Sequence, residues 1–188
     1  MNASRRVLRQ TLLWLLLAGA THALALWALP HVVMRAAMSR LVPATAGDAE
    51  GATAGARVRT VYPPLATAAL RVIVLPSPDL AYALCAYDLT QGPVDVDASP
   101  VWPAYWSVAL YADNTDNYLV RSDRAAARQP VHWRLALDRG VATAGRELVL
   151  APSARGLVLM RVLVADRASQ SVAVAAAQRA LRCHPVTG

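Results

Sequence analysis

The sequence predicts a mainly β protein, in which an antiparallel β-sandwich or jelly-roll-like domain with a C-terminal α-helix follows a single N-terminal transmembrane helix. Two features lead to this prediction. Residues 10–29 contain no charged side chain, and residues 57–164 hold short segments of alternating apolar and polar side chains between glycine, proline and polar turns. Short strands at this spacing favour a sandwich or jelly roll over a parallel sheet.

The uncharged segment 10–29 is long enough to cross a bilayer, because twenty helical residues rise about 30 Å. It follows three arginines, Arg5, Arg6 and Arg9. The positive-inside rule then places the N-terminus in the cytoplasm and the later residues in the periplasm, with the helix in the bacterial inner membrane. A cleaved signal peptide is the alternative, since residues 23–25 resemble a cleavage site. The apolar run continues to Leu29, which favours a retained anchor.

The chain after the anchor begins with two short connecting segments. Beyond Pro30, the helical spacing of Met34, Ala37 and Met38 predicts an amphipathic turn. Residues 43–56 are mainly Ala, Gly and Thr, which predicts a flexible linker. The expected organisation is therefore a cytoplasmic N-terminus (1–9), the transmembrane helix and its exit (10–34), the amphipathic turn and linker (35–56), and a periplasmic β domain (57–188).

Eight β-strands are expected, at residues 57–62, 80–89, 94–98, 105–112, 118–121, 131–137, 147–150 and 156–164. Both faces of strand 80–89 are apolar, so both are expected to be covered. The Gln91-Gly92-Pro93 turn predicts a hairpin between this strand and 94–98. Strand 105–112 places Trp106, Val108 and Leu110 on one face.

A helix is expected to close the chain. Asp166 or Ser169 can cap it, Val174, Ala177 and Leu181 share one face, and Pro185 lies beyond its end. Such a helix would cover a face or an edge of a sheet.

The two cysteines are expected to form a disulfide. Cys85 belongs to a central strand and Cys183 ends the predicted helix, so the bond would join the helix to the sheet. The periplasm is oxidising, which favours the bond. The alternative is a free Cys183, or a Cys183 that pairs with another chain. The Cα atoms should lie within about 7 Å of each other.

Charge and composition exclude several classes of function. The formal net charge is +7, but five of the nineteen arginines flank the anchor, and the remaining fourteen stand against twelve acidic residues. This balanced surface does not predict nucleic-acid binding. The four histidines have unrelated spacings, so neither a metal nor a cofactor is expected. No G-x-S-x-G motif occurs.

Residues 77–98 (SPDLAYALCAYDLTQGPVDVDA) and 105–120 (YWSVALYADNTDNYLV) resemble a bacterial envelope family known as domain of unknown function 1254. The matching residues are Asp79, Tyr82, Asp88, Leu89, Gly92, Pro93, Val94, Tyr105, Trp106 and Asn117. The layout resembles a short, membrane-anchored branch of the family. Longer members join this domain to a second one, domain of unknown function 1214. The resemblance therefore implies that a separate partner chain carries the companion domain.

Two functions of different class are compatible with these observations. The favoured one is a membrane-anchored periplasmic interaction or binding module that acts with a partner chain. The alternative is a periplasmic, hydrolase-like enzyme that uses Asp79, Asp88 and Asp113, although no catalytic spacing supports it. The candidate ligand or partner surface comprises Asp79, Tyr82, Asp88, Tyr105, Trp106, Tyr111, Asn114 and Asn117.

Overall fold

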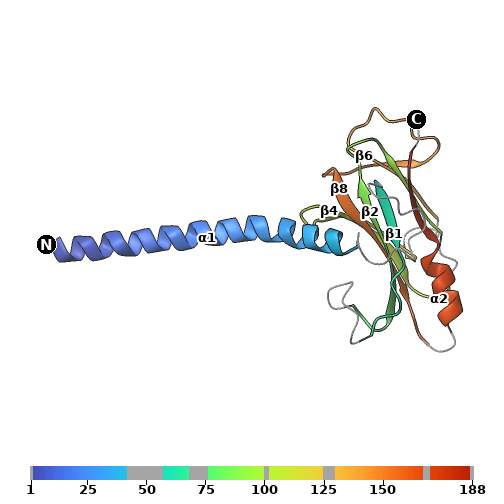
Figure 1. Ribbon diagram of the computed structural model, residues 1–188, viewed down its shortest axis with the longest axis horizontal. Helices are drawn as coiled ribbons and strands as arrows, with labels where there is room; N and C mark the ends of the chain where they lie inside the picture. Colours follow the sequence, from blue (N-terminus) through green and yellow to red (C-terminus); the bar gives the residue numbers. More distant parts are fainter. Residues whose placement is uncertain are drawn as a thin grey trace.

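The computed structural model describes residues 2–41, 57–67, 76–99, 102–124, 130–166 and 170–186. A long helix, α1 (Asn2–Leu41), extends from a β domain of two sheets (Figure 1). Sheet A contains, in spatial order, β1 (Val58–Val61), β2 (Leu80–Asp88), β8 (Arg155–Leu163), β4 (Trp106–Ala112) and β5 (Asn117–Ser122). Sheet B contains β7 (Glu147–Leu150), β6 (Val131–Ala136), β3 (Val94–Ala98) and β9 (Leu181–Pro185). The predicted mainly β fold is confirmed.

The pairing within both sheets is antiparallel, except between β6 and β7, which run parallel. The core lies between the sheets and follows the period-two alternation of the strands. Trp106, Val108 and Leu110 of β4 face it, as expected. Tyr82 and Leu84 form a second cluster on the outer side of sheet A, so both faces of β2 are covered, again as expected.

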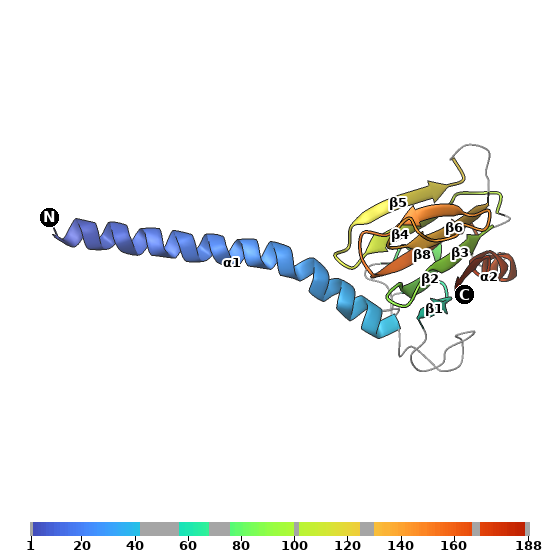
Figure 2. The ribbon, with the colours of Figure 1, turned by 90° about the horizontal axis from the view of Figure 1, so that it is seen from above.

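Helix α1 contains the segment Ser4–Ser39, which is long and apolar enough to span a membrane. The helix does not end near Pro30 but continues to Leu41. A proline inside a helix removes one hydrogen bond and permits a kink, and α1 bends in its second half (Figure 2). Met34, on the predicted amphipathic face, is 6% exposed. The predicted linker at 43–56 lies outside the described residues.

The predicted hairpin between residues 80–89 and 94–98 is wrong. Strand β2 pairs with β1 on one side and β8 on the other, so neither of its edges is left for β3. The turn instead carries the chain into sheet B, where β3 lies between β6 and β9. Gly92 has a φ of +125°, which glycine adopts most readily.

The predicted C-terminal helix is only partly correct. Helix α2 spans Ser171–Gln178, and the chain then enters β9. Leu181 and Cys183 therefore lie in a strand, opposite Ala98 and Val96 of β3. Pairing along this edge outweighs the helix propensity of the sequence. Gln170 occupies the N-cap position and makes no side-chain cap there; Ser169 is outside the described ranges.

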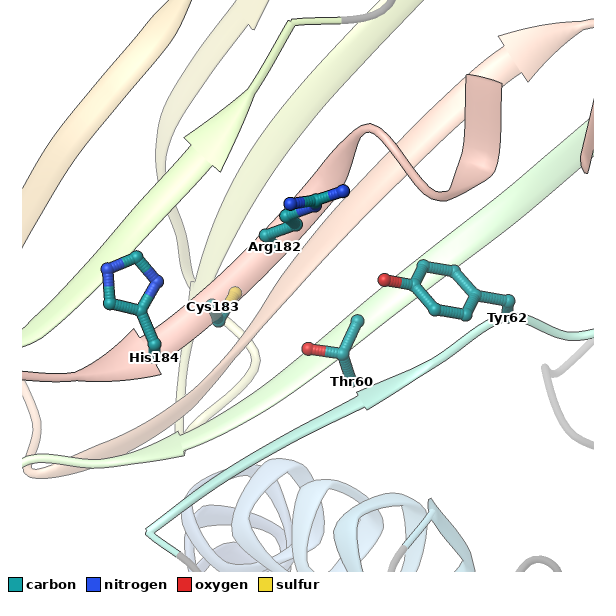
Figure 3. A pocket seen from close by; sticks show the side chains of 5 residues that line it. All are labelled: Thr60, Tyr62, Arg182, Cys183 and His184. Atoms are coloured by element: carbon teal, nitrogen blue, oxygen red, sulfur yellow. The ribbon is translucent and has the colours of Figure 1, made fainter. Parts of the chain in front are cut away.

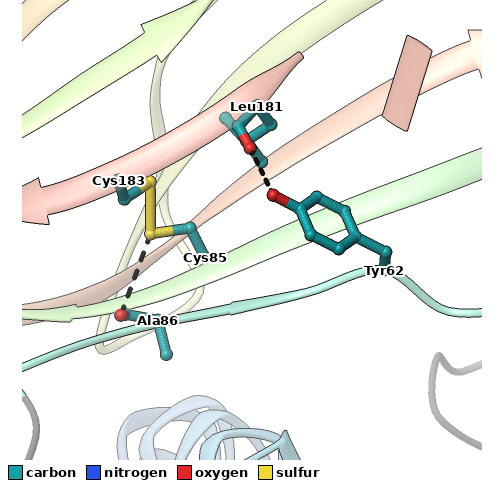
Figure 4. The surroundings of a disulfide bond; sticks show 5 residues. All are labelled: Tyr62, Cys85, Ala86, Leu181 and Cys183. Atoms are coloured by element: carbon teal, nitrogen blue, oxygen red, sulfur yellow. Dashed lines mark hydrogen bonds between the residues drawn. A yellow bond between two sulfur atoms is a disulfide. The ribbon is translucent and has the colours of Figure 1, made fainter. Parts of the chain in front are cut away.

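The two sheets meet along a seam, defined here as the line where β1 and β2 of sheet A lie beside β9 of sheet B. Figure 3 shows side chains of β1 and β9 on its two sides. The predicted Cys85–Cys183 disulfide is confirmed, with the Cα atoms 6.5 Å apart (Figure 4). It joins sheet to sheet rather than helix to sheet. The Tyr62 hydroxyl also crosses the seam and donates to the Leu181 carbonyl at 2.8 Å.

Removing the disulfide should lower the free energy of unfolding. The bond spans a sequence separation of 98 residues, for which the chain-entropy model gives about 4.7 kcal/mol as an upper figure. Urea unfolding of a Cys85→Ala, Cys183→Ala double variant should show a loss of that order. Wild-type protein treated with a reductant should show a similar loss. The same reductant should leave the double variant unchanged; equal midpoints for the oxidised and reduced wild type would contradict the prediction.

Candidate functional site

The acidic residues proposed for an enzyme are spread over the length of sheet A. Asp79 precedes β2 and Asp88 ends it, so the length of a nine-residue strand, about 30 Å, separates them. The exposed Asp79 uses its backbone carbonyl to accept a hydrogen bond from Val164 N–H at 2.8 Å. Asp113, near the Asp88 end, donates its N–H to Ser153 Oγ at 3.0 Å. The structure does not bring Asp79 and Asp88 together.

The Asp88 carboxylate ties the end of β2 to its neighbours. Its Oδ1 accepts hydrogen bonds from Thr90 N–H at 2.9 Å and Thr90 Oγ1 at 2.6 Å, and its Oδ2 accepts one from Arg155 Nε at 2.8 Å. Burial alone would raise the pKa of Asp88, but the bonds from Thr90 and Arg155 together lower it. This carboxylate has its oxygens engaged within the fold.

The aromatic residues proposed for a binding surface lie on different faces. Tyr82 is on the outer side of sheet A, where its hydroxyl accepts a hydrogen bond from Ser77 N–H at 2.8 Å. Trp106 is 3% exposed and belongs to the core between the sheets. Tyr105 accepts a backbone bond from Leu163, and the Tyr111 hydroxyl accepts one from Arg161 Nη2 at 2.9 Å. Trp106 therefore does not share a surface with Tyr82 and Tyr111, which both belong to the outer side of sheet A.

Asn114 and Asn117 belong to the β4–β5 connection. Asn114 Nδ2 donates to Asp116 Oδ2 at 2.7 Å, and Asn114 Oδ1 accepts from Asp116 N–H at 3.1 Å. Asn117 is exposed and begins β5. Such bonds are typical of turn residues.

The outer face of sheet A carries an apolar surface that the sequence analysis did not single out. We call it the leucine face; it comprises Leu80, Leu157, Leu159, Leu163 and Val120. The four leucines are half-buried and Val120 is 54% exposed. A polar row crosses the face in register, from Tyr82 through Arg161 and Ser107 to Ser122.

Two polar atoms of this row lack a hydrogen-bond partner in the described part of the chain. They are Ser107 Oγ, in a residue that is 1% exposed, and Arg161 Nε. Arg161 donates to the Tyr111 hydroxyl, but no carboxylate of the described residues pairs with it. Its charge therefore lies among leucines without a counter-charge, which is an unfavourable arrangement.

The outer face of sheet B carries a charge network, defined here as Asp95, Asp97, His132, Arg134 and Arg146. Strand β3 turns Val94 and Val96 inward and both aspartates outward. Arg134 of β6 forms a double contact with Asp95, Nε to Oδ1 at 2.7 Å and Nη2 to Oδ2 at 2.8 Å. Arg134 Nη1 also donates to the Ala142 carbonyl.

Arg146, which follows β6 and precedes β7, joins the two aspartates. Its Nε lies 3.0 Å from Asp95 Oδ2, and its Nη1 and Nη2 donate to Asp97 Oδ1 and Oδ2 at 2.7 and 3.1 Å. His132 Nδ1 lies 2.6 Å from Asp97 Oδ1. Burial alone would raise the pKa of Asp97, but bonds with Arg146 and His132 lower it. Asp97 therefore stabilises the fold above its ordinary pKa, and this contribution is lost as the pH falls through the lowered value.

The sequence contains a pattern that could have revealed this network. The acidic strand reads Val-Asp-Val-Asp-Ala, and two strands elsewhere alternate basic residues in the same period, His132 with Arg134 and Arg182 with His184. Alternating acids between alternating bases favour cross-strand ion pairs. The pattern has meaning only when β3 is known to lie between β6 and β9.

A pocket of about 270 Å³ opens at the seam. We call it the seam pocket; its lining residues are Thr60, Tyr62, Arg182, Cys183 and His184 (Figure 3). Within the ranges that the structure describes, no three His, Cys, Asp or Glu side chains are grouped closely enough to hold a metal ion.

Comparison with known proteins is informative about family and fold. The model of a family described as "Protein of unknown function (DUF1254)" matches residues 58–185. No curated protein matches the chain. The VPA0106 protein from Vibrio parahaemolyticus is similar in fold, with a TM-score of 0.52 and 15% identity, over 58% of this chain and 28% of that one. An uncharacterized protein from Burkholderia cenocepacia has a TM-score of 0.47 and 15% identity, over 81% of this chain and 40% of that one.

Replacing Asp95 should destabilise the fold strongly, because Asp95 and Arg134 are 5% and 7% exposed. An Asp95→Asn variant leaves a buried guanidinium without its counter-charge, which costs about 3–5 kcal/mol. The matched control is Glu147→Gln, because Glu147 pairs with Arg121 at 2.9 Å in a far more exposed position and such pairs contribute about 0–1 kcal/mol. Urea unfolding at neutral pH would measure both. Equal losses in the two variants would contradict a special role for the buried pair.

Proposed function

The chain belongs to the family described as "Protein of unknown function (DUF1254)", and from this premise we propose that it is a membrane-anchored interaction module whose β domain binds a partner chain in the bacterial periplasm. Helix α1 holds the module in the inner membrane with its N-terminus in the cytoplasm. Its length and apolar composition support this role, as do the arginines that precede the apolar segment.

The observation that carries the proposal is the leucine face with Arg161 at its centre. Apolar side chains gathered on the outside of a sheet are typical of a surface that another protein covers. The leucines of β8 alternate with core residues, so they are arranged by the strand itself rather than by a flexible loop. A partner laid on this face would remove from water Val120 and the exposed parts of the half-buried leucines, three of which already pack against Tyr82 and Leu84.

Arg161 determines which kind of partner fits. A guanidinium that becomes fully buried needs a carboxylate, and a planar carboxylate can accept two of its N–H groups. The partner surface is therefore apolar with a glutamate or aspartate placed to meet Arg161. Ser107 and the Tyr111 hydroxyl lie beside this position.

We assign the partner to a separate chain that carries the companion domain 1214. The resemblance to longer family members that join the two domains supports this assignment, and the match with the Vibrio protein covers 28% of that chain. In such longer chains the corresponding fold is one part among others.

The arrangement of the proposed acidic residues does not support the enzyme alternative. Asp79 and Asp88 lie at opposite ends of β2. Asp88 is engaged by Thr90 and Arg155. Acid–base catalysis needs two groups within reach of one substrate.

A photoreactive amino acid on the leucine face should crosslink to the partner in membranes. Positions 120 and 157 suit this probe because both side chains belong to sheet A's outer surface. Val172 of α2, which is 83% exposed, is the matched control position. Mass spectrometry of the adduct should identify a chain with the companion domain. The charge reversal Arg161→Glu should reduce the adduct several-fold, whereas Arg179→Glu should not.

Two results would contradict the proposed interface. One is equal crosslinking from position 172 and from positions 120 and 157. The other is an adduct that contains two copies of this chain and no second protein.

The anchor should be retained, with the β domain outside the cytoplasm. The intact mass of the membrane-extracted protein should include the N-terminal segment, whereas a chain that starts near Leu26 would refute the anchor. For orientation, Val172→Cys should react with an impermeant maleimide in spheroplasts. Ser4→Cys, near the N-terminal end of α1, should react only after lysis. The reverse pattern would overturn the proposed topology.

A further inference from the structure

The seam pocket is lined by an arginine, Arg182, whose charge the described part of the fold leaves without a counter-charge, and by a histidine, His184. Arg182 and His184 are neighbours on the outer side of β9 and line the pocket from that strand (Figure 3). In the sheet register, Arg182 stands opposite Asp97 and His184 opposite Asp95. These aspartates are the nearest candidates for counter-charges across the pairing.

Both aspartates are already engaged on their other side. The oxygens of Asp97 accept from Arg146 and pair with His132 at 2.6–3.1 Å. The oxygens of Asp95 are contacted by Arg134 and Arg146 at 2.7–3.0 Å. His184 Nε2 is 3.8 Å from Asp95 Oδ2, beyond hydrogen-bond distance.

Arg182 has even less charge compensation than His184. No described carboxylate forms an ion pair with it, although Arg134, Arg146, Arg121 and Arg155 all have one. The outer face of sheet B thus holds three arginines and two histidines around two aspartates. The excess positive charge lies on the β9 side, at the pocket.

The other lining residues make the pocket a suitable receptor for an anion. Thr60 contributes a rotatable hydroxyl that can donate to an oxyanion, and Figure 3 shows this hydroxyl turned toward the side of His184. The Tyr62 hydroxyl donates its hydrogen bond to the Leu181 carbonyl. This bond and the Cys85–Cys183 disulfide hold the two walls at a fixed separation, which lowers the entropic cost of binding.

We propose that the seam pocket binds a small organic or inorganic anion through a carboxylate or phosphate group, with Arg182 as the main contact and His184 and Thr60 as additional donors. Its volume of about 270 Å³ lies just below the usual range for ligand pockets. A small dicarboxylate or a phosphate monoester is thus a better match than a larger ligand. This site is independent of the partner-binding leucine face.

The test is calorimetric titration of the full chain in detergent with inorganic phosphate and, separately, with the dicarboxylate succinate, at constant ionic strength against chloride. Wild-type protein should bind at least one of the two probes saturably. Arg182→Gln should weaken binding about tenfold or more, as expected for the loss of a charge-assisted contact. Arg179→Gln removes the same charge three residues earlier, outside the pocket, and should change the affinity less than twofold.

Thr60→Val provides a second variant that keeps all charges, and it should weaken binding several-fold. As a control for folding, the melting temperatures of the Thr60, Arg182 and Arg179 variants should equal that of the wild-type protein. The proposal is overturned if wild-type protein binds neither probe saturably. It is also overturned if Arg179→Gln weakens binding as much as Arg182→Gln, because that result would indicate a general charge effect.

Discussion

The contact between the edges of the two sheets at the seam is the constraint on which the other features depend. Cys85 is fully buried in the core and Cys183 belongs to the edge strand of sheet B, so their bond fixes which edges lie together. The pocket walls, the Tyr62–Leu181 hydrogen bond and the position of β9 beside β3 all follow from this arrangement. Hydrophobic packing between two sheets tolerates several alignments, whereas a covalent link selects one.

Local alternation predicted the strands well, since the side-chain period of a strand depends on the strand alone. Trp106, Val108 and Leu110 face the core as expected. The two errors of topology concern pairing. The turn at Gly92 fits a hairpin, but β1 and β8 occupy both edges of β2. Leu181 and Cys183 continue a helical pattern, but the free edge of β3 pairs with them, and tertiary pairing outweighs local propensity.

The candidate sites were harder to foresee, because they combine strands that are distant in sequence. Asp79 and Asp88 are close in the sequence yet stand at opposite ends of an extended strand. Asp95 and Arg134 are 39 residues apart yet form the buried ion pair. Arg161 could not be distinguished from any surface arginine, since its importance comes from Ser107 and Tyr82 on the neighbouring strands. Only the strand order converts these alternations into sites.

The late position of β9 in the chain has a consequence for biosynthesis. A ribosome makes Cys85 long before Cys183, and a domain folds as a unit, so the β domain is complete only when β9 has been made. Until β9 is added, β3 has one unpaired edge and Cys85 keeps a free thiol, and both can react with wrong partners. The seam can therefore form only after the whole domain has been made, and a molecule with a finished pocket has already joined its two sheets.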